Sequence, residues 1–281
     1  MNSHSVDALV PTIDELRRRR DEWRREGRVV ALVPTMGALH EGHLSLIDLA
    51  RERSDVVITS VFVNPTQFGP EEDFDRYPRD LKGDLEAAVE RGTDVVFAPT
   101  SEQLYPVEPT IWVEPGSMAD RLCGLSRPGH FRGVLTVVAK LFGCAEPDHA
   151  IFGRKDFQQS VLIGRMVKEL RMSVEIHTGE IVRERDGVAL SSRNAYLTGD
   201  SRRSARSLSQ GLMGVRAAYA AGERSPAGLV GLARAAMEEA GAEVEYAELV
   251  GPEDLEPAAE PADDTVCAVA AAVGASRLVA V

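Results

Sequence analysis

The first part of the chain alternates short, continuous apolar runs with amphipathic segments. The apolar runs predict strands over Val29–Val33, Asp55–Val63, Thr93–Pro99, Asp148–Phe152 and Val174–His177. Apolar spacing of three and four residues predicts helices over Thr12–Glu26, Leu44–Arg53, Asp80–Arg91, Val134–Phe142 and Phe157–Leu170. Continuous apolar runs are typical of parallel strands that are covered on both faces. Strand–helix alternation of this kind therefore predicts an α/β fold with a parallel sheet.

Local signals mark the ends of several of these elements. Thr12 followed by Glu15 is a capping-box pattern at a helix start, and Gly27 is placed to end that helix. The Pro- and Gly-rich segment Ser101–Gly129 predicts irregular backbone, with one short strand at Ile111–Val113.

After Tyr196 the composition shifts toward Ala, Arg, Glu and Gly. This part predicts two amphipathic helices separated by Gly222–Pro226, and then three strands. The predicted strands are Val244–Val250, Thr265–Ala272 and Ser276–Val281. Because the parallel alternation stops near Glu180, we expect two domains, residues 1–180 and residues 181–281.

The stretch Val29–His43 reads as a buried strand, a turn with Pro and Gly, and a helix start that carries His40 and His43. Backbone N–H groups in a first helical turn are unpaired, and the helix dipole is positive there. Two imidazoles added to that end make a site suited to phosphate. The alternative is a pair of solvent-exposed surface histidines.

Further polar side chains follow other predicted strands. Asn64 and Gln67 come just after the second strand, so they should lie near His40 and His43 at the edge where parallel sheets bind ligands. Gly153–Gln159 repeats the strand, glycine turn, polar cluster and helix of the opening stretch. Within it, Asp156 could hold Mg²⁺ or a ribose hydroxyl, and it could also cap the following helix.

A tight turn at Asp186-Gly187 predicts two short strands joined there. The second strand leads into Ser191, Ser192 and Arg193, whose hydroxyls and guanidinium can bind phosphate oxygens. A surface loop with helix-capping serines explains the same residues, and the spacing does not separate the two readings.

Charge and composition narrow the class of protein. The 281 residues carry a net charge of −12, which disfavours a nucleic-acid-binding protein but leaves room for a small anion in a local basic pocket. The basic run Arg17–Arg20 is interleaved with acidic residues, so a solvated helix face is expected there. Three scattered cysteines, no secretory signal and no membrane-length apolar run predict a cytoplasmic protein without a membrane segment.

Motifs that are missing also guide the chemistry. The chain contains no Walker loop, no GxGxxG fingerprint and no GxSxG elbow. An HxGH turn on a parallel sheet instead suggests attack at the α-phosphate of a nucleotide, with pyrophosphate leaving against the helix start.

Six motifs, in this order, resemble the pantothenate synthetase (pantoate–β-alanine ligase) family of the HxGH nucleotidyltransferase superfamily. They are Pro34–His43, Phe62–Phe68, Tyr77–Arg79, His130–Val134, Phe152–Gln159 and Leu190–Asn194. The resemblance implies a Rossmann-like nucleotidyltransferase domain and a smaller C-terminal α/β lid, usually in a homodimer. It implies a reaction in which pantoate and ATP form pantoyl adenylate, which β-alanine then converts to pantothenate and AMP.

The resemblance also assigns residues, position by position. The groups expected to act on the phosphates are His40, His43, Lys155, Ser191, Ser192 and Arg193. The wider ATP site would add Pro34, Thr35, Met36, Gly37, Gly42, Gly153, Asp156, Val182 and Leu190. Pantoate would contact Gln67 and Gln159, with Met36, Asn64 and His130 lining or supporting its pocket. Mg²⁺ is expected with ATP. Arg154 and Leu190 depart from the residues common in the family, Glu and Met.

Two other functions share the HxGH turn. An adenylyl- or cytidylyltransferase would make a dinucleotide-like product and release no AMP. An RNA-binding or aminoacyl-tRNA synthetase-like module would use the basic run Arg17–Arg20, although the acidic balance of the chain speaks against it.

Overall fold

The structure is a computed structural model that describes residues 7–70, 72–274 and 276–281. These residues form two compact units. The first comprises the described residues of 1–115, 127–153 and 162–180, and the second comprises those of 116–126, 154–161 and 181–281. No helix of the described residues is long and apolar enough to cross a membrane.

The first unit is built on a six-stranded parallel sheet, as the sequence predicted. Its strands are β1 (Leu9–Val10), β2 (Val30–Thr35), β3 (Val56–Val61), β4 (Val95–Phe97), β5 (His149–Gly153) and β6 (Glu175–Gly179). Their order in the sheet is β1-β4-β3-β2-β5-β6, so the chain order reverses between β2 and β5. Such a reversal creates a crevice at the carboxyl ends of the two strands, where open α/β sheets bind ligands. The short β1 was not predicted.

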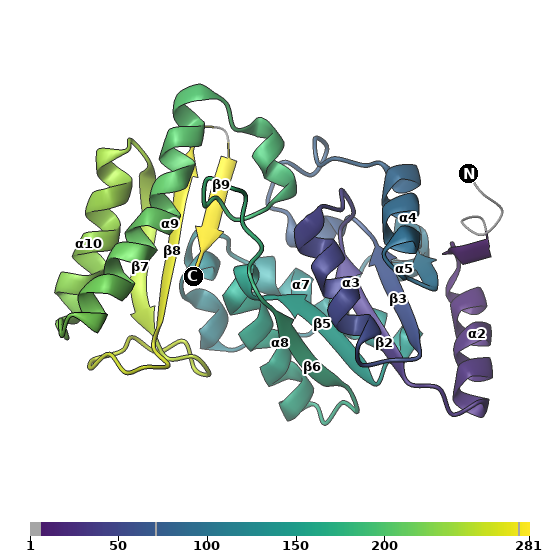
Figure 1. The fold of residues 1–281 in the computed structure, drawn as a ribbon. Coiled ribbons are helices and arrows are strands. Elements are labelled where there is room, and N and C mark those ends of the chain that lie inside the picture. The colour runs from purple at the N-terminus through teal and green to yellow at the C-terminus, as the bar shows by residue number, and fades with distance from the viewer. Residues whose placement is uncertain (1–6, 71, 275) are drawn as a thin grey trace. The chain divides into compact units, whose positions relative to one another are not determined.

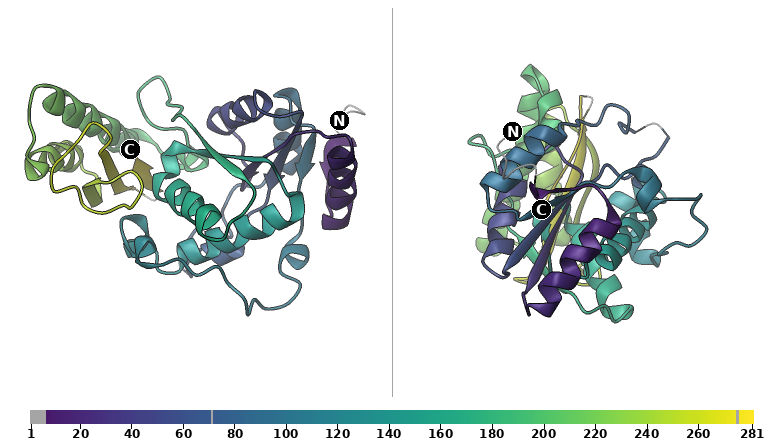
Figure 2. Two further views of the ribbon diagram at one scale, coloured as in Figure 1. Left: turned by 90° about the horizontal axis from the view of Figure 1, so that it is seen from below. Right: turned by 90° about the vertical axis from the view of Figure 1, so that its right-hand side faces the viewer.

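Helices cover both faces of this sheet. They are α2 (Ile13–Arg25), α3 (Glu41–Arg51), α4 (Leu81–Glu90), α5 (Ser101–Leu104), α7 (His130–Ala145) and the later part of α8 (Phe157–Glu169). The helices α3 and α4 pack on β2–β5 through a buried apolar cluster that includes Ile47, Leu85 and Ala31. On the other face α7 contacts β2 and packs on α2 (Figure 2). This double cover explains why the strands read as continuous apolar runs.

Several predicted boundaries are confirmed and others are corrected. The helix predicted over Val134–Phe142 is longer and runs over His130–Ala145. Thr12 caps α2 by accepting from the Glu15 backbone N–H, and Gly27, with φ of +68°, follows the end of that helix. The helix expected from Leu44 begins earlier, at Glu41, so His43 lies inside it. The predicted strand Ile111–Val113 is wrong. The Val113 N–H donates to Thr136 Oγ1 instead of to a neighbouring strand, and Ile111 is 84% exposed.

The second unit contains a three-stranded antiparallel sheet of β7 (Glu243–Val250), β8 (Val266–Val273) and β9 (Ser276–Ala280). Figure 1 shows α9 (Gly199–Ala220) and α10 (Pro226–Glu239) along this sheet, and a buried apolar cluster joins the helices to the strands. The remaining elements are η2 (Ser117–Asp120), α6 (Cys123–Ser126), η3 (Arg154–Asp156) and η4 (Ser192–Tyr196).

A second apolar cluster joins three separate stretches of chain within this unit. Leu122 from the segment 116–126 and Phe157 from the start of α8 pack with Val250 and Ala268 of the sheet. The predicted strand pair around Asp186-Gly187 is present as a tight turn with one β-bridge, Arg183 to Ala189, rather than as two full strands. The turn needs Gly187, whose φ is +92°.

Candidate active site

In the first unit, the turn after β2 is held in a fixed shape by hydrogen bonds. Thr35 Oγ1 donates to the Ser60 carbonyl at 2.7 Å and accepts from the Gly37 N–H at 3.2 Å. Gly37 has φ of +83°, and a Cβ there would lie 2.7 Å from Asp84 Oδ2, so no larger residue fits without a shift. The chain can therefore turn sharply from the end of β2 into α3.

Asp84 of α4 completes this turn. Its carboxylate accepts from the Ala38 N–H at 3.0 Å and from the Leu39 N–H at 2.7 Å. Burial raises the pKa of Asp84 above its ordinary value, although the two backbone hydrogen bonds act in the opposite direction. Asp84 was not predicted as a site residue. The sequence contained a signal for it, because Asp84 falls on the apolar face of the predicted helix Asp80–Arg91. A carboxylate on such a face must accept hydrogen bonds from buried donors.

The turn delivers His40 and His43 to the first turn of α3, as predicted. His40 is the N-cap residue of α3, and the two imidazole rings stack with their centroids 4.1 Å apart. The His40 backbone N–H donates to His43 Nδ1 at 3.4 Å. A neutral His43 that accepts at Nδ1 carries its proton on Nε2, which makes Nε2 a donor. Imidazole donors and the N–H groups of a helix start together form an anion-binding site.

The second group of predicted residues in this unit surrounds the short helix η1 (Pro65–Gln67). Gln67 Nε2 donates to Met36 Sδ at 3.2 Å, and Gln67 Oε1 accepts from Asn64 Nδ2 at 3.0 Å. Asn64 is fully buried and also donates to the Gly133 carbonyl at 3.2 Å. Met36, Asn64 and Gln67 are therefore brought together, as the sequence predicted, and the Gln67 amide is held in one orientation.

His130, the first residue of α7, supports this group from the opposite side. Its Nδ1 lies 2.8 Å from the Gln67 carbonyl, and its Nε2 lies 3.0 Å from Arg127 Nη1. Because a guanidinium can only donate, we assign the His130 proton to Nδ1, which then donates to Gln67. Arg127 is itself paired with Glu72. Burial raises the pKa of Glu72, but the contacts with Arg127, His130 and the Gly69 backbone together lower it below its ordinary value.

Two residues near Gln67 were missed from the sequence. Arg127 orients His130, and the Tyr105 hydroxyl donates to Asn64 Oδ1 at 2.9 Å. Burial raises the pKa of Tyr105, so its hydroxyl keeps the proton that it donates. No short motif contains these residues, and only the tertiary fold brings them to η1.

In the second unit, the predicted residues fall on two segments. Lys155 and Asp156 form η3, where the Lys155 ammonium lies 3.2 Å from Asp156 Oδ2. Gln159 lies in the first turn of α8, next to the buried Gln158, whose amide donates to the Met118 and Arg121 carbonyls. Gly153, the last residue of β5, belongs to the first unit.

The other segment is the arm that follows the Gly187 turn. The Leu190 N–H donates to the Val182 carbonyl at 2.9 Å, so these two predicted residues are neighbours. Ser191 caps η4 by accepting from the Arg193 N–H at 3.3 Å, and Ser192 and Arg193 lie within η4. The structure therefore shows Ser191 as a helix cap. A role in binding phosphate remains compatible with this, because a capping serine can also bind a ligand.

Arg202 of α9 fixes the base of this arm and was not predicted. Its guanidinium bonds both oxygens of Glu184, at 3.0 and 2.7 Å, and both oxygens of Asp186, at 2.8 Å each. These bonds lower the pKa of both carboxyls below their ordinary values. Glu184 also accepts from Asn194 Nδ2 at 2.8 Å, which connects Arg202 to η4.

Comparison with known proteins identifies the family to which the chain is similar. The family model described as pantoate-beta-alanine ligase matches residues 8–280. Pantothenate synthetase of Pelobacter propionicus is 47% identical over 272 residues, covering 96% of this chain and 96% of that protein. The crystal structure of pantothenate synthetase from Thermus thermophilus has a TM-score of 0.91 and 40% identity, with 97% of each chain covered.

A second solved structure carries ligands. Pantoate-beta-alanine ligase from Francisella tularensis, complexed with beta-gamma ATP and beta-alanine, has a TM-score of 0.82 and 32% identity. The match covers 97% of this chain and 95% of that chain. The chain therefore belongs to the pantoate–β-alanine ligase family, and the prediction from its six motifs is confirmed.

Proposed function

We propose that this chain catalyses the ATP-dependent condensation of pantoate with β-alanine, giving pantothenate, AMP and pyrophosphate. The observation that carries the proposal is the family match across residues 8–280, which includes every predicted site residue. The HxGH turn at the start of α3, next to the strand-order reversal, supports it independently. The other two functions share this turn, so the family match is what favours the ligase over them.

The first step proposed is adenylation. A carboxylate oxygen of pantoate attacks the α-phosphorus of ATP, and the bond from that phosphorus to the β-phosphate oxygen breaks. Such a displacement needs positioning and charge neutralisation more than covalent help. We assign to His40 and His43 the stabilisation of charge on the phosphates and the leaving pyrophosphate. Pro34, Thr35, Met36, Gly37 and Gly42 shape the turn on which they stand.

The other phosphate and nucleoside contacts are assigned to Gly153 of the first unit and to residues of the second unit. Lys155, Ser191, Ser192 and Arg193 would hold the phosphates by charge-assisted hydrogen bonds. We assign the ribose to Gly153 and Asp156, and the adenine pocket to Val182 and Leu190.

The second step proposed is amide formation. The β-alanine amine attacks the acyl carbon of pantoyl adenylate, the bond from that carbon to the phosphate oxygen breaks, and the amine loses a proton. Gln67 and Gln159 are assigned to pantoate, because uncharged amides can bind hydroxyl and carboxylate oxygens without adding charge. Water would destroy the acyl adenylate, so we assign to residues 181–281 the role of a lid domain and to residues 1–180 that of the ATP- and pantoate-binding domain.

Mg²⁺ is proposed as the ion that accompanies ATP. Mg²⁺ usually keeps several waters and binds one or two carboxylates together with substrate phosphates. The exposed carboxylate of Asp156, 3.2 Å from the Lys155 ammonium, is an oxygen donor of the right kind, and Mg²⁺ is the alternative to the ribose as its ligand. When bound, the ion would neutralise charge on the phosphates. We further propose a cytoplasmic location and a homodimer.

The test uses the purified full chain with ATP and Mg²⁺. We expect AMP to accumulate only when pantoate and β-alanine are both present, and ATP–pyrophosphate exchange to require pantoate alone. An adenylyl- or cytidylyltransferase would release pyrophosphate without AMP, and that pattern would contradict the proposal. Salt-sensitive RNA binding together with no AMP formation would favour the third function instead.

A further inference from the structure

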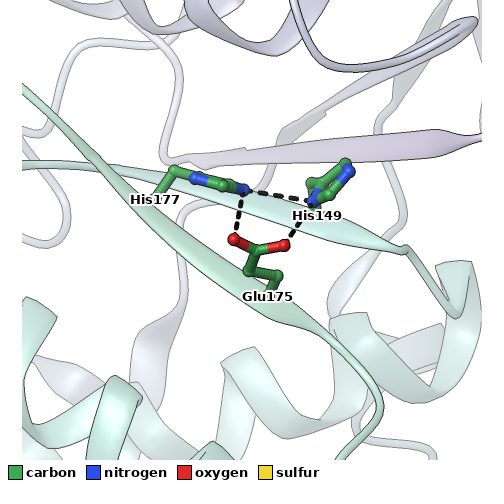
Figure 3. Close-up of side chains that lie close together, drawn as sticks. All are labelled: His149, Glu175 and His177. Carbon is green, nitrogen blue, oxygen red and sulfur yellow. Dashed lines mark hydrogen bonds and ion pairs between the residues drawn. The ribbon is translucent and has the colours of Figure 1, made fainter.

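Three potential metal ligands lie together on the sheet of the first unit, away from the residues assigned to ATP. His149 begins β5, Glu175 begins β6, and the two are register partners. His177 follows two residues along β6. Because side chains alternate along a strand, Glu175 and His177 share a face of the sheet, and the parallel register places His149 beside them. Figure 3 shows the three side chains converging.

The distances within this cluster are close to those between ligands of one metal ion. His177 Nε2 lies 3.1 Å from His149 Nδ1, and the nearest Glu175 oxygens lie 3.6 Å from His149 Nδ1 and 3.7 Å from His177 Nε2. Metal–ligand bonds of roughly 2.0–2.2 Å at tetrahedral angles separate ligand atoms by roughly 3.3–3.6 Å. One ion can therefore reach all three residues with little movement.

We propose that His149, Glu175 and His177 bind one divalent transition-metal ion of the Zn²⁺ class. Two imidazoles and one carboxylate are a donor set that suits Zn²⁺ rather than Mg²⁺ or Ca²⁺, which prefer oxygen ligands alone. The imidazoles are partly buried, with side-chain exposures of 21% and 19%, and Glu175 is 67% exposed. Water can therefore supply the fourth ligand.

Glu175 brings the one formal negative charge among the three ligands. Its two carboxylate oxygens lie 3.6 Å from His149 Nδ1 and 3.7 Å from His177 Nε2. Removing that negative charge should therefore weaken metal binding more than the loss of a neutral contact would.

The position of the cluster indicates what the ion does. His149 is the register partner of Ala31, near the start of β2, whereas the HxGH turn follows the far end of β2. The cluster thus lies at the amino ends of the strands, and the ion is separate from any Mg²⁺ that enters with ATP. Because β6 is the last strand of the sheet, with β5 as its neighbour, the ion would cross-link an edge strand to the sheet and stabilise it.

The test measures Zn²⁺ binding to the full chain after removal of metal with a chelator. Zinc chloride is titrated in competition with a chromophoric chelator, and the melting temperature is recorded with and without zinc. We expect the wild type to bind one equivalent of zinc. The affinity for this zinc should fall at least about 10-fold in Glu175→Gln and in the double variant His149→Ala/His177→Ala. Zinc should raise the melting temperature of the wild type and not of these variants.

The control is Glu114→Gln, which removes a carboxylate of nearly equal exposure, 68%, elsewhere in the same unit. It should bind zinc like the wild type. Glu175→Gln preserves side-chain size, so it separates loss of a ligand from loss of folding, and ligase activity without zinc should persist in all variants. Wild-type affinity and stoichiometry in both cluster variants would place the zinc at other residues, such as His40 and His43, and overturn the proposal. A wild type that binds no zinc at micromolar concentrations would also overturn the proposal.

Discussion

At the scale of single residues, hydrogen bonds within the chain fix the backbone of the HxGH turn. Thr35, Gly37 and Asp84 hold the turn, and the His40 backbone N–H sets the tautomer expected for a neutral His43. A donor that is already oriented needs no reorganisation when charge develops on the leaving group.

His43→Ala removes one such donor while leaving α3 in place. We expect ATP–pyrophosphate exchange in the presence of pantoate to fall about 10²-fold, the scale of losing one transition-state donor. Glu41→Gln, in the same helical turn but paired with Arg91 on the surface, is the control and should exchange at nearly the wild-type rate. Exchange near the wild-type rate in His43→Ala would show that this histidine does not act in the first step.

Gln67 offers a second test at this scale. Its amide is fixed by Met36 and Asn64, so truncation to Ala should remove a substrate contact and leave the nucleotide contacts intact. We expect Gln67→Ala to raise KM for pantoate by about 10-fold, the effect of losing roughly one hydrogen bond to a charged group. The KM for ATP should change little. A similar rise in both values would mean that Gln67 has been assigned to the wrong substrate.

At the scale of elements, α7 must approach η1 closely to place His130 under Gln67. Gly133 permits this approach, because a Cβ there would lie 2.3 Å from the Thr66 carbonyl oxygen. The sequence placed Gly133 just before the predicted helix Val134–Phe142, whereas the structure includes it in α7, where a glycine usually weakens the helix. Only the packing explains why this position needs one.

Gly133→Ala should therefore lower the free energy of unfolding by about 1–3 kcal/mol, because the helix must move away from η1. Gly143 lies in the same helix, and a Cβ added there would meet no packed neighbour within 4 Å among the described residues, so Gly143→Ala is a matched control. Helix propensity predicts that this control is unchanged or stabilised by up to about 1 kcal/mol. Equal effects of the two changes in chemical denaturation would argue against the close approach.

The arm of the second unit gives a pH-dependent prediction. Hydrogen bonds from Arg202 lower the pKa of Glu184 and Asp186 in the folded state. The stabilisation is therefore present above the ordinary carboxyl pKa of about 4 and is lost as the pH falls through the lowered values. We expect Arg202→Gln to lose about 1–2 kcal/mol at pH 7 and much less near pH 3.

Arg203→Gln is the control for this change. Arg203 is the next residue along α9, its side chain is 76% exposed, and its partner Asp200 is 94% exposed. Such a pair contributes little at any pH. Urea unfolding at several pH values compares the two variants, and a constant difference between Arg202→Gln and the wild type would contradict the assignment to these carboxylates.

At the scale of the whole molecule, the proposed homodimer needs a surface that favours association. The extended segment between α5 and η2 carries Val107 and Ile111, which are 73% and 84% exposed. Large exposed apolar patches are typical of association surfaces. We propose that Val107 and Ile111 belong to such a surface and that a second copy of the chain buries them.

Sedimentation velocity should therefore give twice the chain mass of 30.5 kDa. We expect Ile111→Glu to shift the molecule toward the single-chain mass, because a charge would have to be buried in the contact. Leu170→Glu, at an apolar position that is 56% exposed, is the control and should sediment like the wild type. A single-chain mass for the wild type at micromolar concentration would contradict the homodimer.

The sequence by itself determined most of the secondary structure, the parallel sheet and the family. These features are encoded locally, in apolar runs, caps and short motifs such as Pro34–His43. It misplaced a strand at Ile111–Val113, where the tertiary fold gives Val113 a side-chain partner instead of a strand.

Only the tertiary structure decided which residues hold the motifs in place. Asp84, Tyr105, Arg127 and Arg202 act on residues that no shared motif links to them, so no local pattern could assign their partners. The cluster of His149, Glu175 and His177 likewise depends on the register of two strands that are separated by a helix. The partners in these contacts are far apart in the sequence. Only tertiary packing brings their side chains within hydrogen-bond distance, so no local pattern reveals them.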